Sequence, residues 1–242
     1  MSASLSGGLI GGQKALVDAA ACARCGNCAA HCRFGAVRET DAGFVVDPIA
    51  CEGCGVCVAV CPEQAVRLVD DVAGEQALYR EEAVFSTAKL KMGRGNSGKL
   101  VTEVKKALVA ESEAALAIID GSPGIGCPVI ASVNGMDLVL VVAEPSGSGI
   151  SDLKRLCATA ATLQVQLAVC VNKYDVSPQH TERIETFCRQ QGIAFVGKIP
   201  FDPMAVRAVN EGTTVVDIDC PAGRAVREIF AKLTALLAER SI

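Results

Sequence analysis

The stretch CARCGNCAAHC (residues 22–32), repeated as CEGCGVCVAVC (residues 51–61), decides the fold of the first part of this chain. Both stretches have the spacing C-x2-C-x2-C-x3-C. The offset of 29 residues between them also aligns Ala36-Val37 with Ala65-Val66, so the pattern is an internal repeat. The repeat predicts a small domain built from two similar halves.

The cysteine spacing suits a four-iron cluster, because such a cube presents one iron to each of four thiolates. Three cysteines at i, i+3 and i+6 wrap one face of the cube, while Gly26 and Gly55 let the backbone turn close to it. We expect the fourth cysteine of each run to start the following helix and to bind the other cluster. The predicted ligands are Cys22, Cys25, Cys28 and Cys61 for cluster 1, and Cys51, Cys54, Cys57 and Cys32 for cluster 2.

Other uses of these residues compete with the two clusters. Zinc also binds four thiolates, but zinc motifs usually pair two C-x2-C hooks and lack the third cysteine. His31 is an alternative ligand of the Rieske kind, although each cluster already has four cysteines. Arg33 follows the first run where Pro62 follows the second, a departure that leaves the ligand intact. Because residues 20–75 hold few large apolar side chains, the clusters are expected to supply much of their stability.

Composition narrows the function classes. The chain has 242 residues, half of them hydrophobic, and a net charge of -4 without a basic run, so we expect no nucleic-acid partner. Its start lacks the pattern of a signal peptide, and no apolar run reaches the length of a membrane span, so we expect no membrane partner. Thirteen cysteines without a secretion signal indicate metal or redox use. These features predict a cytoplasmic protein. We expect its source to be an anaerobe.

The sequence changes character at about residue 76. Strands that are apolar throughout alternate with helical patterns, which predicts a parallel sheet covered on both faces. We expect an extended segment at 81–90, buried strands at 115–121, 137–145, 165–173 and 193–201, and helices at 98–112, from about 151, at 177–192 and at 221–242.

Polar residues follow two of these strands, at the sheet edge where ligands of such folds bind. Asp120 ends the strand at 115–121, and a carboxylate there suits a magnesium-bound water. Asn172 and Asp175 belong to the segment NKYD after the strand at 165–173, a pattern that suits a nucleotide base. Ordinary turn chemistry explains NKYD equally well. Asp120, Asn172 and Asp175 are therefore the candidate nucleotide-binding residues.

The order of segments resembles one family. CRFGAV (32–37), CPEQAV (61–66), IIDGSPGIG (118–126) and VCVNKYD (169–175) are similar to the MinD/ParA-like ATPases that carry an inserted two-cluster ferredoxin domain, relatives of the nitrogenase iron protein. The resemblance implies a doubly wound sheet of the P-loop NTPase type. It also implies that Asp120 matches the acidic residue of the Walker B loop, that residues 121–126 form a switch loop, and that Asn172 contacts the base.

The phosphate-binding loop of this family is not found where it is expected. The stretch GGLIGGQKAL (7–16) has Lys14, but Gln13 and Ala15 stand where a glycine and the metal-binding hydroxyl belong. The stretch GRGNSGKL (93–100) has P-loop spacing, yet Leu100 replaces the hydroxyl residue. We therefore expect an incomplete sheet without Walker A, and residues 93–100 as a connector near the nucleotide face whose Ser97 caps the next helix.

Five cysteines lie outside the repeat. Cys157, Cys170 and Cys188 fall in predicted helices and a strand, where buried cysteine acts as a small hydrophobe, and Cys220 receives no role. By the resemblance, Cys127 has the offset from Asp120 of a cluster ligand in the nitrogenase iron protein. No second cysteine stands in the region of residues 93–100 to complete such a site. Packing at a helix start before Pro128 is the alternative.

Together these features predict a lead-in at residues 1–19, a ferredoxin-like domain at 20–75 with two [4Fe-4S] clusters, and a MinD/ParA-like α/β domain at 76–242. The predicted function is electron transfer without autonomous ATP hydrolysis, and no catalytic residue is assigned. The alternative is a nucleotide-switched ATPase subunit or a cluster carrier, which would use ATP and magnesium and take its P-loop from a partner chain or a longer start. The predicted partners are a redox protein and either a second copy or a complete paralogue.

Overall fold

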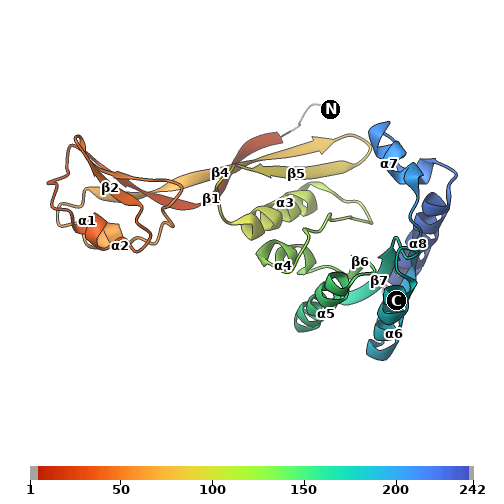
Figure 1. Cartoon of the computed structure of the whole chain (residues 1–242). Helices are drawn as coiled ribbons and strands as arrows, with labels where there is room; N and C mark the ends of the chain where they lie inside the picture. Colours follow the sequence, from red (N-terminus) through yellow and green to blue (C-terminus); the bar gives the residue numbers. More distant parts are fainter. Residues whose placement is uncertain (1–4, 240–242) are drawn as a thin grey trace. The chain divides into compact units, whose positions relative to one another are not determined.

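The computed structural model describes residues 5–239, and its internal contacts divide the chain into two compact units (Figure 1). Unit 1 ends at Asp120 and unit 2 begins at Gly121. The first four residues of the predicted lead-in and the last three of the predicted α/β domain lie outside the described residues. Between residues 5 and 239, the helices are all too short or too polar to cross a membrane.

The cysteine repeat folds into two β-α-β halves, as the sequence predicts. Each half has a strand, a cysteine loop, one turn of helix and a second strand. The first strand of the first half pairs antiparallel with the second strand of the second half, and the two inner strands pair antiparallel with each other. The elements are β1 (Leu5–Val17), α1 (Asn27–Ala30) and β2 (Val37–Thr40), then β3 (Gly43–Val46), α2 (Val56–Ala59) and β4 (Val66–Arg80), with β1 paired to β4 and β2 to β3.

Unit 1 continues past the repeat. The strand β5 (Val84–Leu90) pairs with β4 to give the order β1-β4-β5, and the helix α3 (Ser97–Glu111) packs on this sheet. Gln76 Nε2 donates to the carbonyl oxygen of Glu103 at 3.3 Å, and Ser86 Oγ donates to that of Val104 at 2.9 Å. The expected extended segment and the expected helix are thus present.

The first strand lies where the sequence analysis expected a lead-in without a strand. β1 occupies most of the predicted lead-in and runs along β4, whose pairing extends from Leu5 opposite Leu78 to Val17 opposite Val66. This pairing, with α3 on the same sheet, ties residues on both sides of the cysteine repeat into unit 1. The unit boundary at Asp120 therefore differs from the domain boundaries expected at residues 19 and 75. Those domain boundaries stay predictions.

Unit 2 is an α/β fold around a parallel sheet, which confirms the predicted fold class. The strands lie in the order β6-β7-β8, with β7 paired to both neighbours in parallel. Its elements are α4 (Cys127–Val133), β6 (Leu138–Ala143), α5 (Gly147–Thr162), β7 (Gln166–Asn172), α6 (Pro178–Gln191), β8 (Ala194–Ile199), α7 (Pro203–Asn210), the 3-10 turn η1 (Val215–Asp217) and α8 (Pro221–Ala238).

Helices cover both faces of this sheet. Val169 and Val171 of β7 pack with Leu153 of α5 and Ile184 of α6, and all four side chains are at most 2% exposed. The alternate residues of β7 point the other way, toward Ile229 of α8. A strand with both faces buried reads as an unbroken apolar run, which is why the sequence places β7 so clearly.

Two expectations about this region are wrong. Residues 115–121 form no strand, and Ile118 in their middle is 77% exposed. An apolar run predicts burial but does not supply the neighbouring strand that its backbone needs, and in the described part of the chain the parallel sheet consists of β6, β7 and β8 alone. The helix expected from about residue 151 begins at Gly147, because Ser146 caps it by accepting from Gly149 N at 3.0 Å.

Candidate metal centre

The cysteine loops are built alike in the two halves. Gly26 and Gly55 precede α1 and α2 and both have φ 77°, a left-handed backbone that glycine adopts without strain. This turn directs the chain into one helical turn that holds Cys28 in the first half and Cys57 in the second. The turns predicted at the two glycines are therefore present.

The last cysteine of each run lies elsewhere than predicted. Cys32 and Cys61 follow α1 and α2 and do not start a helix, because the helical turn ends just before them. Each sulfur instead accepts a backbone hydrogen bond from the residue that leads into the next strand, from Ala36 N at 3.4 Å and from Ala65 N at 3.3 Å. The aligned Ala-Val pairs of the repeat thus hold the fourth cysteines in equivalent positions.

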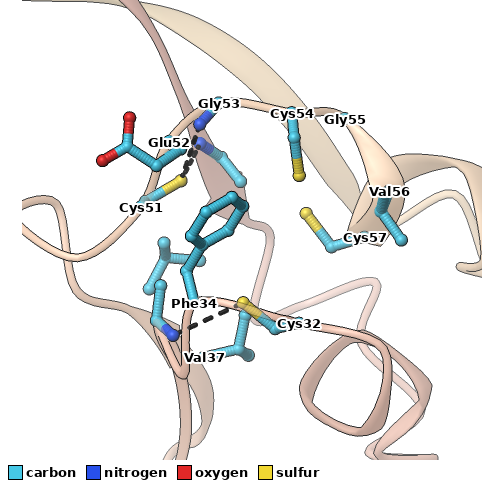
Figure 2. A pocket seen from close by; sticks show the side chains of 13 residues that line it. Cys32, Phe34, Val37, Cys51, Glu52, Gly53, Cys54, Gly55, Val56 and Cys57 are labelled. Atoms are coloured by element: carbon cyan, nitrogen blue, oxygen red, sulfur yellow. Dashed lines mark hydrogen bonds between the residues drawn. The ribbon is translucent and has the colours of Figure 1, made fainter.

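One cavity gathers cysteines from both runs. Cys32 of the first run and Cys51, Cys54 and Cys57 of the second line it, together with Phe34. Figure 2 shows their four sulfur atoms turned toward a common space, with the dashed hydrogen bonds to Cys51 and Cys32. This is the set predicted for cluster 2, so the fold permits the crossed ligation that the repeat suggests. The individual ligand assignments stay predictions.

Within each loop the thiols perturb one another. Burial, with repulsion from Cys22 and Cys25, raises the pKa of Cys28. Burial likewise raises the pKa of Cys57, and the charges of Cys51 and Cys54 add to the effect. Three neighbouring thiolates are therefore unfavourable without a compensating positive charge, which iron supplies when it binds thiolate. The donor set fits an iron-sulfur cluster.

A single metal ion and a four-iron cluster require different arrangements of their ligands. Among the described residues, no three side chains of His, Cys, Asp or Glu are placed to hold a single metal ion. A four-iron cube binds each thiolate at a different corner, so its ligands need not meet at one point. His31, the alternative ligand, places Nδ1 2.9 Å from the carbonyl oxygen of Asn27, one turn earlier.

The stretch with P-loop spacing, residues 93–100, binds other segments of unit 1 through hydrogen bonds and an ion pair. Arg94 Nη1 donates to the carbonyl oxygen of Pro48 at 2.6 Å, and Arg94 also pairs with Asp71 of β4 at 3.4 Å. Asn96 Nδ2 donates to the carbonyl oxygen of Gly11 in β1 at 2.6 Å. Asn96, not Ser97, is the N-cap residue of α3, and no side chain caps that helix, so the predicted cap is wrong.

The glycine-rich stretch at residues 7–16 is no phosphate-binding loop. It lies inside β1 and pairs with β4 along its length. A Cβ added to Gly11 would overlap the Cβ of Ala73, so the glycines make room for side chains of the neighbouring strand. Lys14 of this stretch donates from Nζ to the carbonyl oxygen of Cys51.

Lys14 is a residue whose place at the metal centre sequence reasoning missed. The glycines and the lysine of residues 7–16 resemble an incomplete Walker A motif, which favours a role in phosphate binding. The repeat could have indicated this position of Lys14. The strand before the first cysteine loop, β1, pairs with the strand after the second loop, β4. That pairing brings β1 next to the loop that contains Cys51.

Two candidate nucleotide residues lie at the carboxyl edge of the unit 2 sheet. Asn172 is the last residue of β7 and is half-buried. Asp175 in the following turn accepts from Phe201 N at 2.8 Å and so ties that turn to the segment after β8. Lys173 pairs with Glu144, which follows β6, at 3.2 Å. The NKYD segment thus performs turn chemistry, and its contact with a nucleotide stays a prediction.

Asp120 is the last residue of unit 1 and is exposed. It is not strand-terminal, because no strand forms at residues 115–121. Its proposed match to a Walker B carboxylate therefore rests on the resemblance alone.

The cysteines outside the repeat take different positions. Cys170 and Cys188 are fully buried and Cys157 is partly buried, as expected of core residues. Burial raises the pKa of both Cys170 and Cys188 to about 11. Cys220 caps α8, where its sulfur accepts from Gly223 N at 3.3 Å. Cys127 begins α4 before Pro128 and is exposed.

Comparison with known proteins supports this picture of a metal centre joined to an ATPase fold. A family model described as a 4Fe-4S binding domain matches residues 44–67, the half that contains the second cysteine run. The MinD cell division protein of Aquifex aeolicus has a similar structure, with a TM-score of 0.50 and 20% sequence identity over 66% of this chain and 68% of that one.

Two curated relatives are similar in sequence. The uncharacterized protein MJ0578 of Methanocaldococcus jannaschii is 30% identical over 216 residues, which are 88% of this chain and 71% of the relative. The iron-sulfur cluster carrier protein of Pyrococcus furiosus is 30% identical over 158 residues, which are 59% of this chain and 54% of the relative. The chain thus spans only about half the length of the carrier protein.

These similarities identify the class as a 4Fe-4S-binding protein on a MinD-like α/β scaffold. The chain belongs to one family with the uncharacterized protein MJ0578 of Methanocaldococcus jannaschii, and its structure has the MinD-like fold.

Proposed function

We propose that the chain is an electron-transfer protein that carries two [4Fe-4S] clusters on its MinD-like scaffold and does not hydrolyse ATP by itself. The observation that carries the proposal is the pair of equivalent cysteine loops, the second of which lines one cavity with Cys32 of the first run. A cluster of this kind accepts and donates single electrons. The chain's own residues bind it, exclude water around it and set its potential.

The internal ligand sets favour resident clusters over cargo. A cluster that is delivered to another protein must leave, whereas four cysteines held by two halves of one small fold retain it. Cys28 and Cys51 are buried, at 7% exposure each, and α1 contacts α2, so the two loops lie close together. This closeness supports the passage of an electron between the clusters. The partner would be a redox protein, and a second copy or a complete paralogue would join the α/β part.

A nucleotide-switched subunit or a cluster carrier is the alternative function. The MinD-like fold and the relative named as a cluster carrier support it. Within the described residues, however, both glycine-rich stretches are committed to contacts inside unit 1, through β1 and through Arg94 and Asn96. ATP and magnesium would then require a phosphate-binding loop from elsewhere, and Asn172 and Asp175 of unit 2 would contact the nucleotide.

Iron analysis of anaerobically purified protein tests the proposal. We expect about eight irons per chain and the spectrum of reducible [4Fe-4S] clusters. Cys32→Ser should perturb the cluster bound by the second run and spare the other. Cys127→Ser is the matched control, since this exposed cysteine lies outside the repeat and should leave iron unchanged.

Two results would contradict the proposal. About four irons per chain would mean that one ligand set is wrong. Rapid transfer of iron from the loaded chain to an apo-ferredoxin would favour the carrier function. Equilibrium dialysis against Mg-ATP addresses the nucleotide, and a Kd tighter than about tens of micromolar would favour the switched subunit.

A further inference from the structure

The two cysteine loops have the same spacing but different neighbours. The residue two positions after the first cysteine is left-handed in both, with φ 58° at Arg24 and φ 62° at Gly53. A Cβ added to Gly53 would overlap the carbonyl oxygen of Gln13 in β1. The second loop thus packs directly against β1, at the position where the first loop carries an exposed arginine.

Hydrogen bonds to the cysteine sulfurs follow the same difference. Cys51 Sγ accepts from Ala15 N of β1 at 3.5 Å and from Gly53 N at 3.4 Å. Cys32 and Cys61 accept one hydrogen bond each from equivalent residues, so these two bonds do not distinguish the two predicted clusters. In residues 5–239 no hydrogen bond reaches the sulfur of Cys22, the counterpart of Cys51. Cys28 and Cys57 accept matching backbone hydrogen bonds, so the two bonds to Cys51 are the difference between the two predicted ligand sets.

A cation adds to the difference. Half-buried Lys14 donates from Nζ to the carbonyl oxygen of Cys51, whereas the equivalent residue in the repeat is Gly43, which has no side chain. The other charges in the two loops, Arg24 in the first and Glu52 in the second, are exposed and screened by solvent. Arg33 beside Cys32 is exposed as well.

Reduction adds one negative charge to a cluster. Hydrogen bonds to the sulfurs and a nearby positive charge stabilise the reduced form and raise its potential. We infer that cluster 2 is reduced before cluster 1, and that Lys14 and the backbone of β1 are the positioning residues that set this order. The inference rests on the proposed two-cluster electron-transfer function.

The order gives the electron a direction. A low-potential one-electron donor, dithionite in the test, loses one electron and the cluster gains it, with no bond made or broken within the protein. At equilibrium that electron resides on cluster 2, beside the loop from Cys51 to Cys57. The acceptor would take it from this side of unit 1.

A redox titration followed by electron paramagnetic resonance tests the order on the iron-loaded full chain. The ligand variants Cys25→Ser and Cys54→Ser, both at exposed cysteines, assign each signal to cluster 1 or cluster 2. The signal that appears first in the unsubstituted chain should be the one that Cys54→Ser alters. Appearance of the Cys25-dependent signal first would overturn the inference.

Lys14→Met tests the role of the lysine. At the potential where cluster 2 of the unsubstituted chain is half-reduced, the ratio of reduced to oxidised cluster 2 should fall several-fold, while cluster 1 is unchanged. Lys14→Arg should restore the ratio, and Lys89→Met, at an exposed lysine on β5, should leave both clusters unchanged. An equal change in both clusters, or none, would contradict the role of Lys14.

The iron content separates two kinds of failure. About four irons in the unsubstituted chain would refute the two-cluster function itself. About eight irons with cluster 1 reduced first would refute only the order. If Lys14→Met lost iron, the order in the unsubstituted chain would still decide the inference.

Discussion

The two units of this chain have different kinds of interior. The buried cluster of the ferredoxin-like part contains small residues and the cysteines themselves, with Phe44 as its one large side chain. The interior of unit 2 contains Ile150, Leu153 and Ile184, packed between a sheet and two helices. Apolar burial scales with side-chain area, so unit 2 has a core of its own, while we expect the cysteine loops to depend on the clusters that they are proposed to bind. A cysteine pattern and a hydrophobic pattern are thus two routes to a folded unit.

Removal of iron should have the largest effect and tests this comparison most directly. An iron chelator applied to the reduced, iron-loaded chain should unfold residues 20–75, because their interior has few large apolar side chains and includes predicted cluster ligands. The strands β6, β7 and β8 should keep their protection. Hydrogen exchange followed by mass spectrometry measures both regions in one sample. Equal protection of the cysteine loops with and without iron would break the comparison.

A cavity in the other unit should have a moderate effect. Leu153→Ala removes a side chain that is 2% exposed and should lower the free energy of unfolding of unit 2 by about 2–5 kcal/mol. Iron content should not change, because this residue has no part in unit 1. Urea denaturation followed by circular dichroism, with an iron assay in parallel, measures both quantities.

The control for this variant is an exposed residue on the same helix. Arg155→Ala should change the free energy of unfolding by less than about 0.5 kcal/mol. Loss of iron from Leu153→Ala, or an equal loss of stability in Arg155→Ala, would show that the units are not stabilised separately.

The smallest effect concerns the chemistry of thiols that hold no iron. Cys170 and Cys188 have pKa values of about 11 through burial, so at pH 8 about one thiol in a thousand is the reactive thiolate. Short exposure of the iron-loaded chain to iodoacetamide should therefore label exposed Cys127 and spare these two. Their labelling should increase as the pH rises toward 11. Peptide mapping gives the order, and labelling of Cys188 as fast as Cys127 would contradict it.

Sequence reasoning succeeded where the pattern in the sequence also specifies which segments contact one another. The spacing of the cysteines predicts two similar halves, the turns at Gly26 and Gly55, and the gathering of Cys32 with the second run, because each feature follows from wrapping one cube. The strands β6, β7 and β8 were also predictable, since an apolar run between helices has few alternatives in a parallel sheet.

The failures share one cause, which is a missing or unexpected neighbour. Residues 115–121 have the composition of a buried strand, but no strand of the described chain pairs with them. The glycines of β1 were expected in a lead-in without a strand, and their pairing with Val72 and Ala73 of β4 was not predicted. Asn96 stands at the start of α3 with its side chain on the carbonyl oxygen of Gly11, a contact across 85 residues that no local pattern contains.

The contact between β1 and Cys51 bears on the time course of folding. Ala15 N reaches a sulfur that lies 36 residues later in the chain, so the second loop is complete only after β1 has closed onto β4. Closing a loop of that length precedes any gain from the contacts that it brings. In the first loop, the left-handed residue Arg24 donates from Nη2 to the carbonyl oxygen of Asp41 at 3.1 Å, a contact across only 17 residues. During synthesis, we therefore expect Cys22, Cys25 and Cys28, the predicted ligands of cluster 1, to take their positions before β1 pairs with β4 and completes the second loop.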